Sequence, residues 1–173
     1  VLAWNDAFER IGFRDVVRVA DFPRDTAFDS TAPSLSTIRF SPCGKNSCDC
    51  SLQTDSRTGE ILNATICLHS GVLEYYADLL VVQAAASQPK LRTGELPEEM
   101  MGAIVRAVVM QAVGRSLGLE RNPGASYAYP VDSLRSASFT SRYGIVSYVM
   151  EDLGLSYVAR PEGVAGGGRG VQE

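Results

Sequence analysis

The segment from Pro97 to about Leu117 most constrains what this chain can fold into. Pro97 and two acidic residues, Glu98 and Glu99, favour a helix start, and Gly118 favours its end. Apolar side chains cover nearly every side of this helix: Met100, Met101, Ile104, Val105, Val108, Val109, Met110 and Val113. A helix of this kind is buried, so the rest of the chain has to supply a core around it.

Hydrophobic spacing predicts two further helices and three strands. The helical period covers residues 2–13 and 71–88. Strand patterns cover residues 35–41 and 61–70, which alternate, and residues 15–22, which form a short apolar run. The chain therefore combines helices and strands in one fold.

The connecting segments are polar or rich in turn-forming residues. They are residues 23–34, the cysteine-rich stretch 41–60 and the linker 89–96. Beyond Asn122 little regular pattern remains, except a short helix expected near 146–153. The Gly-rich tail 163–173 is expected to be disordered.

Composition limits the classes of function. The chain has 173 residues, a formal net charge of -4 and 45% hydrophobic residues, as expected for one globular domain. No cluster of Lys and Arg interleaves with aromatic residues, so we expect no nucleic-acid partner. No apolar run reaches the roughly 18 residues that span a bilayer. The chain begins at Val1 without a signal-peptide pattern, and we expect it to be a piece of a longer protein with other domains.

Four cysteines, Cys43, Cys48, Cys50 and Cys67, leave several uses open. One or two disulfides that fasten the cysteine-rich loop to the strand carrying Cys67 are the favoured use, and they require an oxidising compartment. A four-thiolate zinc site is the second, although C-x4-C-x-C-x16-C is not a zinc-ribbon spacing. Free thiols are the third. Cys48 or Cys50 could also pair with His69, the only histidine, as nucleophile and base.

Five segments in consistent order resemble the catalytic domain of metzincin zinc metallopeptidases, in particular large secreted bacterial peptidases with the helix H-E-V-G-H-T-L-G-L-x-H-N. These segments are WNDAFERIGF (4–13), DSRTGEILNATI (55–66), VGRSLGLERN (113–122), ASYAYPVDSLRSASFTSRYG (125–144) and SYVMEDLGLSYVARPE (147–162). The resemblance implies one α/β (α+β), zincin-like domain over residues 1–162. It would have a small twisted mixed sheet, two long helices, and an irregular C-terminal part with a Met-turn at Met150. We expect residues 61–70 to be the edge strand that borders the cleft.

The zinc motif H-E-x-x-H-x-x-G-x-x-H corresponds to QAVGRSLGLER in this chain. Gln111, Arg115 and Arg121 occupy the three histidine positions, and Ala112 occupies the position of the general base. Only Gly118 is retained. Arginine stays protonated and offers no electron pair to a cation, and alanine cannot transfer a proton. We therefore expect that zinc, and with it the ancestral peptidase activity, has been lost.

The changed positions allow two interpretations. Gln111, Arg115 and Arg121 could form a pocket for an anion or a peptide carboxylate. In the favoured interpretation, Arg115 instead pairs with an internal acid, because a buried arginine requires a partner. The candidate acids are Glu120, Asp132, Glu151 and Asp152.

Both interpretations predict a catalytically inactive peptidase-like domain. It would serve as a peptide- or protein-binding or structural module of a larger extracytoplasmic bacterial protein, which is periplasmic, on the cell surface or secreted. The alternative is an active metallopeptidase with an unrecognised metal site.

Overall fold

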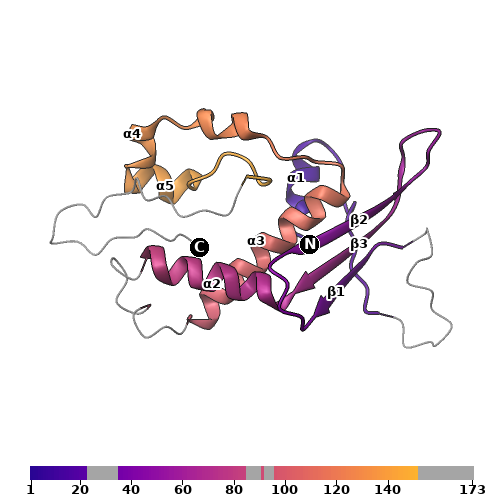
Figure 1. The fold of residues 1–173 in the computed structure, drawn as a ribbon. Helices are drawn as coiled ribbons and strands as arrows, with labels where there is room; N and C mark the ends of the chain where they lie inside the picture. Colours follow the sequence, from indigo (N-terminus) through magenta and orange to yellow (C-terminus); the bar gives the residue numbers. More distant parts are fainter. Residues whose placement is uncertain (23–34, 85–90, 92–95, 152–173) are drawn as a thin grey trace.

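The computed structural model describes residues 1–22, 35–84, 91 and 96–151 (Figure 1). Three strands form one sheet in the order β1-β3-β2. Their bounds are Thr37–Ser41 for β1, Cys48–Thr54 for β2 and Ile61–His69 for β3. β1 runs parallel to β3, and β2 runs antiparallel to it. This mixed sheet, together with two long helices, confirms the expected small α+β fold.

Two long helices and several short ones accompany the sheet. Their bounds are Trp4–Arg10 for α1, Ser70–Ala84 for α2, Glu98–Ser116 for α3, Pro123–Ala128 for the 3-10 helix η2, Val131–Leu134 for α4 and Ala137–Tyr143 for α5. In Figure 1, α2 and α3 lie together beside the strands, and α4 and α5 gather at the far end from the sheet. The expected helices at 71–88 and 97–117 correspond to α2 and α3, with 85–88 outside the described residues. None of the helices in the described part of the chain is long and apolar enough to cross a membrane.

The core lies between β3 and the C-terminal half of α3. Ile66 packs against Ala112 and Val113 of α3, while Leu68 contacts Val108. The alternation of β3 sends these side chains toward the helix and sends Cys67 to the opposite face. Full burial of one such aliphatic side chain contributes about 1.5–3 kcal/mol, so this seam fixes α3 against the sheet.

Helix α3 is less buried than its sequence suggests. Only Val108, Ala112, Val113 and Gly114 are buried along it, whereas Arg115 is exposed. The prediction of burial on nearly all sides is therefore wrong for much of the helix among the described residues. Apolar side chains in the N-terminal half of α3 are instead only partly buried. Met100, for example, packs against Leu91.

Gly118 ends α3 as expected. Its φ is +84°, a conformation that glycine adopts without steric cost. The Gly118 N–H donates to the Arg115 carbonyl at 2.9 Å, and the Leu119 N–H donates to the Gly114 carbonyl at 3.0 Å. This pair of bonds is a Schellman motif, and it turns the chain away from the helix axis.

The strand predicted at residues 15–22 is wrong. This segment has no regular secondary structure and no strand partner among the described residues, and Val19 is 61% exposed. The Asn5 side chain accepts a hydrogen bond from the Val17 N–H and donates one to the Val17 carbonyl, both at 2.9 Å. A side-chain amide thus pairs with the backbone groups that a sheet would otherwise satisfy.

The prediction that residues 61–70 form an edge strand is also wrong, because β3 is the central strand. The edge beside α3 belongs to β2, which lies within the stretch expected to be a loop. Its sequence, CDCSLQT, looks polar. However, Cys48 and Cys50 face the core and pack as small apolar side chains.

The region after Asn122 differs from expectation in two ways: the described part of the helix expected at 146–153 is not helical, and short helices form that were not expected. Residues 146–151 form a turn rather than a helix, with the Glu151 N–H donating to the Tyr148 carbonyl at 3.1 Å. Residues 152 and 153 lie outside the described part, as do the predicted loop 23–34 and the tail 163–173. The short helices between 123 and 143 were not predicted. Two of them begin at side-chain caps, where Asn122 accepts from the Gly124 N–H and Ser136 accepts from the Phe139 N–H.

Candidate functional site

A pocket of about 190 Å³ lies between the start of β2, helix α2 and helix α3. Its lining residues are Asn46, Ser47, Cys48, Val72, Tyr76, Val108, Gln111, Ala112 and Arg115. The structure thus brings together Gln111, Ala112 and Arg115, three of the four positions expected to correspond to the ligands and base of the zinc motif. Gln111 and Arg115 are one helical turn apart and therefore share a face. Arg121, beyond the end of α3, does not line the pocket.

Gln111 connects α3 to the C-terminal segment. Its side-chain amide nitrogen donates to the backbone carbonyl of Glu151. The residue at the first expected ligand position therefore makes a structural hydrogen bond across the fold. A glutamine amide is also not among the usual protein ligands of zinc, which are Cys, His, Asp and Glu side chains.

Arg115 is the exposed cation of the pocket. Within the described residues, no ion pair joins it to Glu120, Asp132 or Glu151. Asp132 instead pairs with Arg135 at 3.6 Å, and the Glu151 carboxylate accepts a hydrogen bond from Ser126. The expected internal partner is therefore wrong for these three acids. Asp152, the fourth candidate, lies outside the described residues.

The charge of Arg115 acts on the groups around the pocket. Burial raises the pKa of the Cys48 thiol to about 11, with Arg115 opposing the rise. Burial also raises the pKa of Tyr76, and Arg121 and Arg115 both oppose that rise. Although Arg121 does not line the pocket, its charge therefore reaches the same tyrosine. The side of the sheet that faces α3 therefore has a positive electrostatic character.

Met150 lies in the turn that follows α5 and is 2% exposed. A Cβ on Gly114 would overlap the Met150 sulfur and would lie 3.2 Å from the Trp4 ring. The Trp4 indole N–H also donates to the Met110 carbonyl at 3.2 Å. Helices α1 and α3 and the Met150 segment thus meet at a glycine. Assignment of this turn as a Met-turn remains a prediction.

All four cysteines are free thiols in the structure, so it contains none of the predicted disulfides. The strand register explains why most pairings are unfavourable. Cys48 and Cys50 lie opposite Leu68 and Ile66 and face α3, whereas Cys67 lies opposite Asp49 on the other face. The four-thiolate zinc site is therefore wrong, since the sheet separates its ligands.

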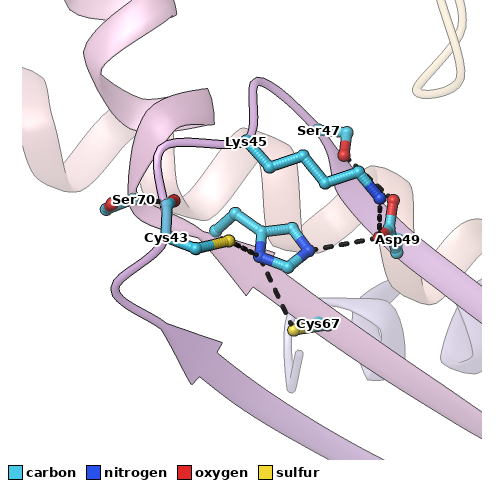
Figure 2. A network of polar contacts seen from close by, with 7 residues as sticks. Cys43, Lys45, Ser47, Asp49, Cys67 and Ser70 are labelled. Carbon is cyan, nitrogen blue, oxygen red and sulfur yellow. Dashed lines mark hydrogen bonds and ion pairs between the residues drawn. The ribbon is translucent and has the colours of Figure 1, made fainter.

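His69 pairs with a different cysteine from the two that were predicted. Its Nδ1 lies 2.9 Å from Cys43 Sγ, and its Nε2 lies 3.2 Å from a carboxylate oxygen of Asp49 (Figure 2). The predicted pairing of His69 with Cys48 or Cys50 is wrong because both cysteines are on the opposite face of the sheet. This network was missed because Cys43, Asp49 and His69 meet only when β2 pairs antiparallel with β3.

The pocket residues do not fit a zinc ion. A catalytic zinc site needs three protein ligands from histidine, cysteine or carboxylate side chains, and Cys48 is the one residue of these types among the described residues that line the pocket. Arg115 offers only N–H donors and repels cations, and Ala112 has no polar atom. The described part of the chain contains no group of three or more His, Cys, Asp or Glu suited to hold a metal ion.

A family model described as Met-zincin matches residues 93–169 of the chain. This segment contains α3, η2, α4, α5 and Met150. No curated protein and no solved structure matches the chain. The matched part of the chain is therefore metzincin-like, and the chain carries a metallopeptidase-like domain.

Proposed function

We propose that this metzincin-like domain is catalytically inactive and binds an extended peptide segment that carries a carboxylate. The observation that supports this most strongly is the pocket beside β2, in which an exposed Arg115 stands one helical turn from Gln111. A peptidase of this family would need metal ligands and a general base there. This chain has a guanidinium, an amide and a methyl group in their place.

The chemistry of these side chains opposes peptide hydrolysis. Hydrolysis in a zinc peptidase requires a metal-bound water and a group that removes its proton. The Arg115 guanidinium offers only N–H donors, and Ala112 cannot accept a proton. The amide nitrogen of Gln111 is engaged by the Glu151 carbonyl. None of the three can supply a step of the ancestral reaction.

The same side chains favour binding of a carboxylate. A guanidinium holds a carboxylate through two parallel N–H···O bonds. Arg115 is exposed and has no acidic partner among the described residues. β2 forms the edge of the described sheet and begins at the pocket with Cys48. An edge strand can accept an extended peptide by strand addition, and a carboxylate on that peptide would then meet Arg115.

Metal content and hydrolysis test the inactive state. The protein is dialysed against zinc, and loosely bound metal is then removed. We expect less than one zinc per chain to remain. We also expect no cleavage of unfolded protein substrates. One tightly held zinc per chain, with hydrolysis that a chelator abolishes, would establish the alternative of an active metallopeptidase with an unrecognised metal site.

Binding of acidic peptides tests the pocket. The probes are extended peptides with one Glu, compared with the same peptides carrying Gln, by fluorescence anisotropy. Arg115→Ala should weaken binding of the Glu peptides, while leaving the Gln peptides nearly unaffected. Arg106→Ala is the matched control, since Arg106 is also exposed on α3 but does not line the pocket. Equal binding by both variants would exclude Arg115 from the binding site, and no binding by the wild type would favour a purely structural module.

A further inference from the structure

A second cluster of reactive groups lies on the face of the sheet opposite α3. Cys43 Sγ is 2.9 Å from His69 Nδ1, and His69 Nε2 is 3.2 Å from Asp49 Oδ2. These two contacts place the imidazole ring between the Cys43 thiol and the Asp49 carboxylate, which are both labelled in Figure 2. The His69 side chain is only 10% exposed, whereas Cys43 is exposed to solvent. A buried base thus faces an accessible nucleophile.

The protonation of the ring follows from Asp49. Hydrogen bonds from Lys45, Ser47 and His69 lower the pKa of Asp49 to about 2. The carboxylate is therefore ionised near neutral pH and can only accept hydrogen bonds. Consequently the hydrogen of neutral His69 belongs on Nε2, and the lone pair of Nδ1 points at the Cys43 thiol.

The loop that carries Cys43 is fastened to the start of α2. The Cys43 carbonyl accepts hydrogen bonds from the Ser70 hydroxyl at 3.0 Å and from the Gly71 N–H at 3.3 Å. Gly71 permits this close approach, because a Cβ there would lie 2.5 Å from the Gly44 carbonyl carbon. The thiol is therefore positioned by the backbone as well as by the contact with His69.

Cys67 completes the cluster. Its sulfur lies 3.9 Å from the same Nδ1 of His69, so two sulfurs approach one ring nitrogen. Cys48 and Cys50 face the core on the other side of the sheet, and burial raises the pKa of both thiols. Among the four cysteines, Cys43 and Cys67 are therefore the pair placed to react with one another.

We propose that Cys43 is a peroxide-reactive thiol, with His69 as its base, Asp49 as a positioning residue and Cys67 as the resolving cysteine. This site touches the carboxylate pocket at Ser47, which lines the pocket and donates to Asp49, but its chemistry does not involve Arg115. Its substrate class is hydroperoxides, including hydrogen peroxide, and its product is a Cys43–Cys67 disulfide.

The reaction balances in two steps. The thiol proton moves to His69 Nδ1, and the Cys43 thiolate attacks one peroxide oxygen as the O–O bond breaks. The leaving oxygen takes the proton from the imidazolium and departs as water or an alcohol, while the cysteine is oxidised to a sulfenic acid. The Cys67 thiol then attacks the Cys43 sulfur, the S–O bond breaks, and water leaves as the disulfide forms.

Alkylation kinetics test the activated thiol. The reduced protein is treated with iodoacetamide, and modification of each cysteine is followed by peptide mass spectrometry across pH 5–10. A thiol with pKa near 11, as at Cys48, carries on the order of a hundredfold less thiolate at neutral pH than an ordinary cysteine. Cys43 is exposed and lies 2.9 Å from His69 Nδ1, so activation by His69 should make it react more than on the order of a hundredfold faster than Cys48.

Asp49→Asn should move the pH profile of Cys43 alkylation to higher pH, because the imidazolium loses its ionic partner. Lys45→Ala is the matched comparison, since it removes a contact of Asp49 and leaves the Asp49–His69 bond in place. Two results would refute activation of Cys43 by His69. One is alkylation of Cys43 that is no faster than that of Cys48, and the other is a pH profile of Cys43 that Asp49→Asn does not move.

Oxidation with hydrogen peroxide tests the resolving step. The wild type should form a Cys43–Cys67 disulfide, whereas Cys67→Ser should accumulate a sulfenic acid on Cys43 that dimedone traps. Cys50→Ser, on the opposite face, should behave as the wild type. A disulfide between other cysteines, or an unchanged product in Cys67→Ser, would refute the assignment of Cys67.

Discussion

Replacement of Gly114 by alanine should destabilise the domain, although alanine is the better helix former. In an open helical position this change gains roughly 0.5–1 kcal/mol. At Gly114 the added methyl would overlap the Met150 sulfur and approach the Trp4 ring to 3.2 Å. Met150 is 2% exposed, so its side chain has little free space into which to move. Overpacking of this kind costs about 1–3 kcal/mol, and we expect a net loss of about 1–2 kcal/mol in the free energy of unfolding.

The matched control is Gly102→Ala in the same helix. Gly102 is exposed, and a Cβ there meets nothing within 4 Å. This variant should gain roughly 0.5–1 kcal/mol, so the two substitutions are expected to have opposite signs. Urea unfolding followed by far-UV circular dichroism measures both, and the fluorescence of Trp4, the only tryptophan, reports the contact itself. Equal stabilisation by the two variants would refute the packing of Met150 and Trp4 against Gly114.

Three other predictions concern the caps, the pocket and the core thiols. Ser136→Ala should cost about 1 kcal/mol in urea unfolding, because the Ser136 hydroxyl accepts from the Phe139 N–H at the start of α5; no change would show that α5 does not depend on its cap. The double variant Gln111→His and Arg115→His should bind zinc in a calorimetric titration, because the two new imidazoles share one helical face. The wild type should not bind zinc. Absence of zinc binding by the double variant would mean that the two side chains do not converge. The unfolding free energy should be steady below about pH 9 and fall as the pH rises toward 11, because the pKa of Cys48 is raised to about 11 in the fold from 9.0. This alkaline loss should shrink in Cys48→Ser, and an equal loss in that variant would contradict the assignment.

The parts of the fold that were predicted are those in which burial follows a regular period. β3 places Ala64, Ile66 and Leu68 on one buried face, and period-two spacing is enough to identify such a strand. The boundaries of α3 follow from Glu98 and Glu99 at its start and from Gly118 at its end. In each case the local sequence and the tertiary environment favour the same structure.

The errors occur where a contact distant in sequence decides the structure. Asn5 pairs with the backbone of Val17 and takes the place of a strand partner. In β2, Cys48 and Cys50 act as core residues although their neighbours are polar. No local pattern indicates either arrangement, and the missed β2 also led to the wrong position of β3 in the sheet.

The candidate pocket was partly predictable from spacing alone. Gln111, Ala112 and Arg115 lie within one helical turn, so any helix there places them together. Arg121 follows the Schellman turn, and its position depends on the path of the chain beyond Gly118. The cluster of Cys43, Asp49 and His69 was not predictable, because it needs the register of two strands and the course of a loop.

β2 explains how the two proposed sites can be neighbours and still present different reactive groups. Successive side chains of a strand point to opposite faces, so Cys48 lines the pocket while Asp49 contacts His69. Arg115 acts on the thiols of Cys48 and Cys50, which share its side of the sheet. Arg115→Ala should therefore weaken peptide binding without changing Cys43 alkylation, and Asp49→Asn should do the reverse. If each variant changed both peptide binding and Cys43 alkylation, the two faces of β2 would not separate the two sites.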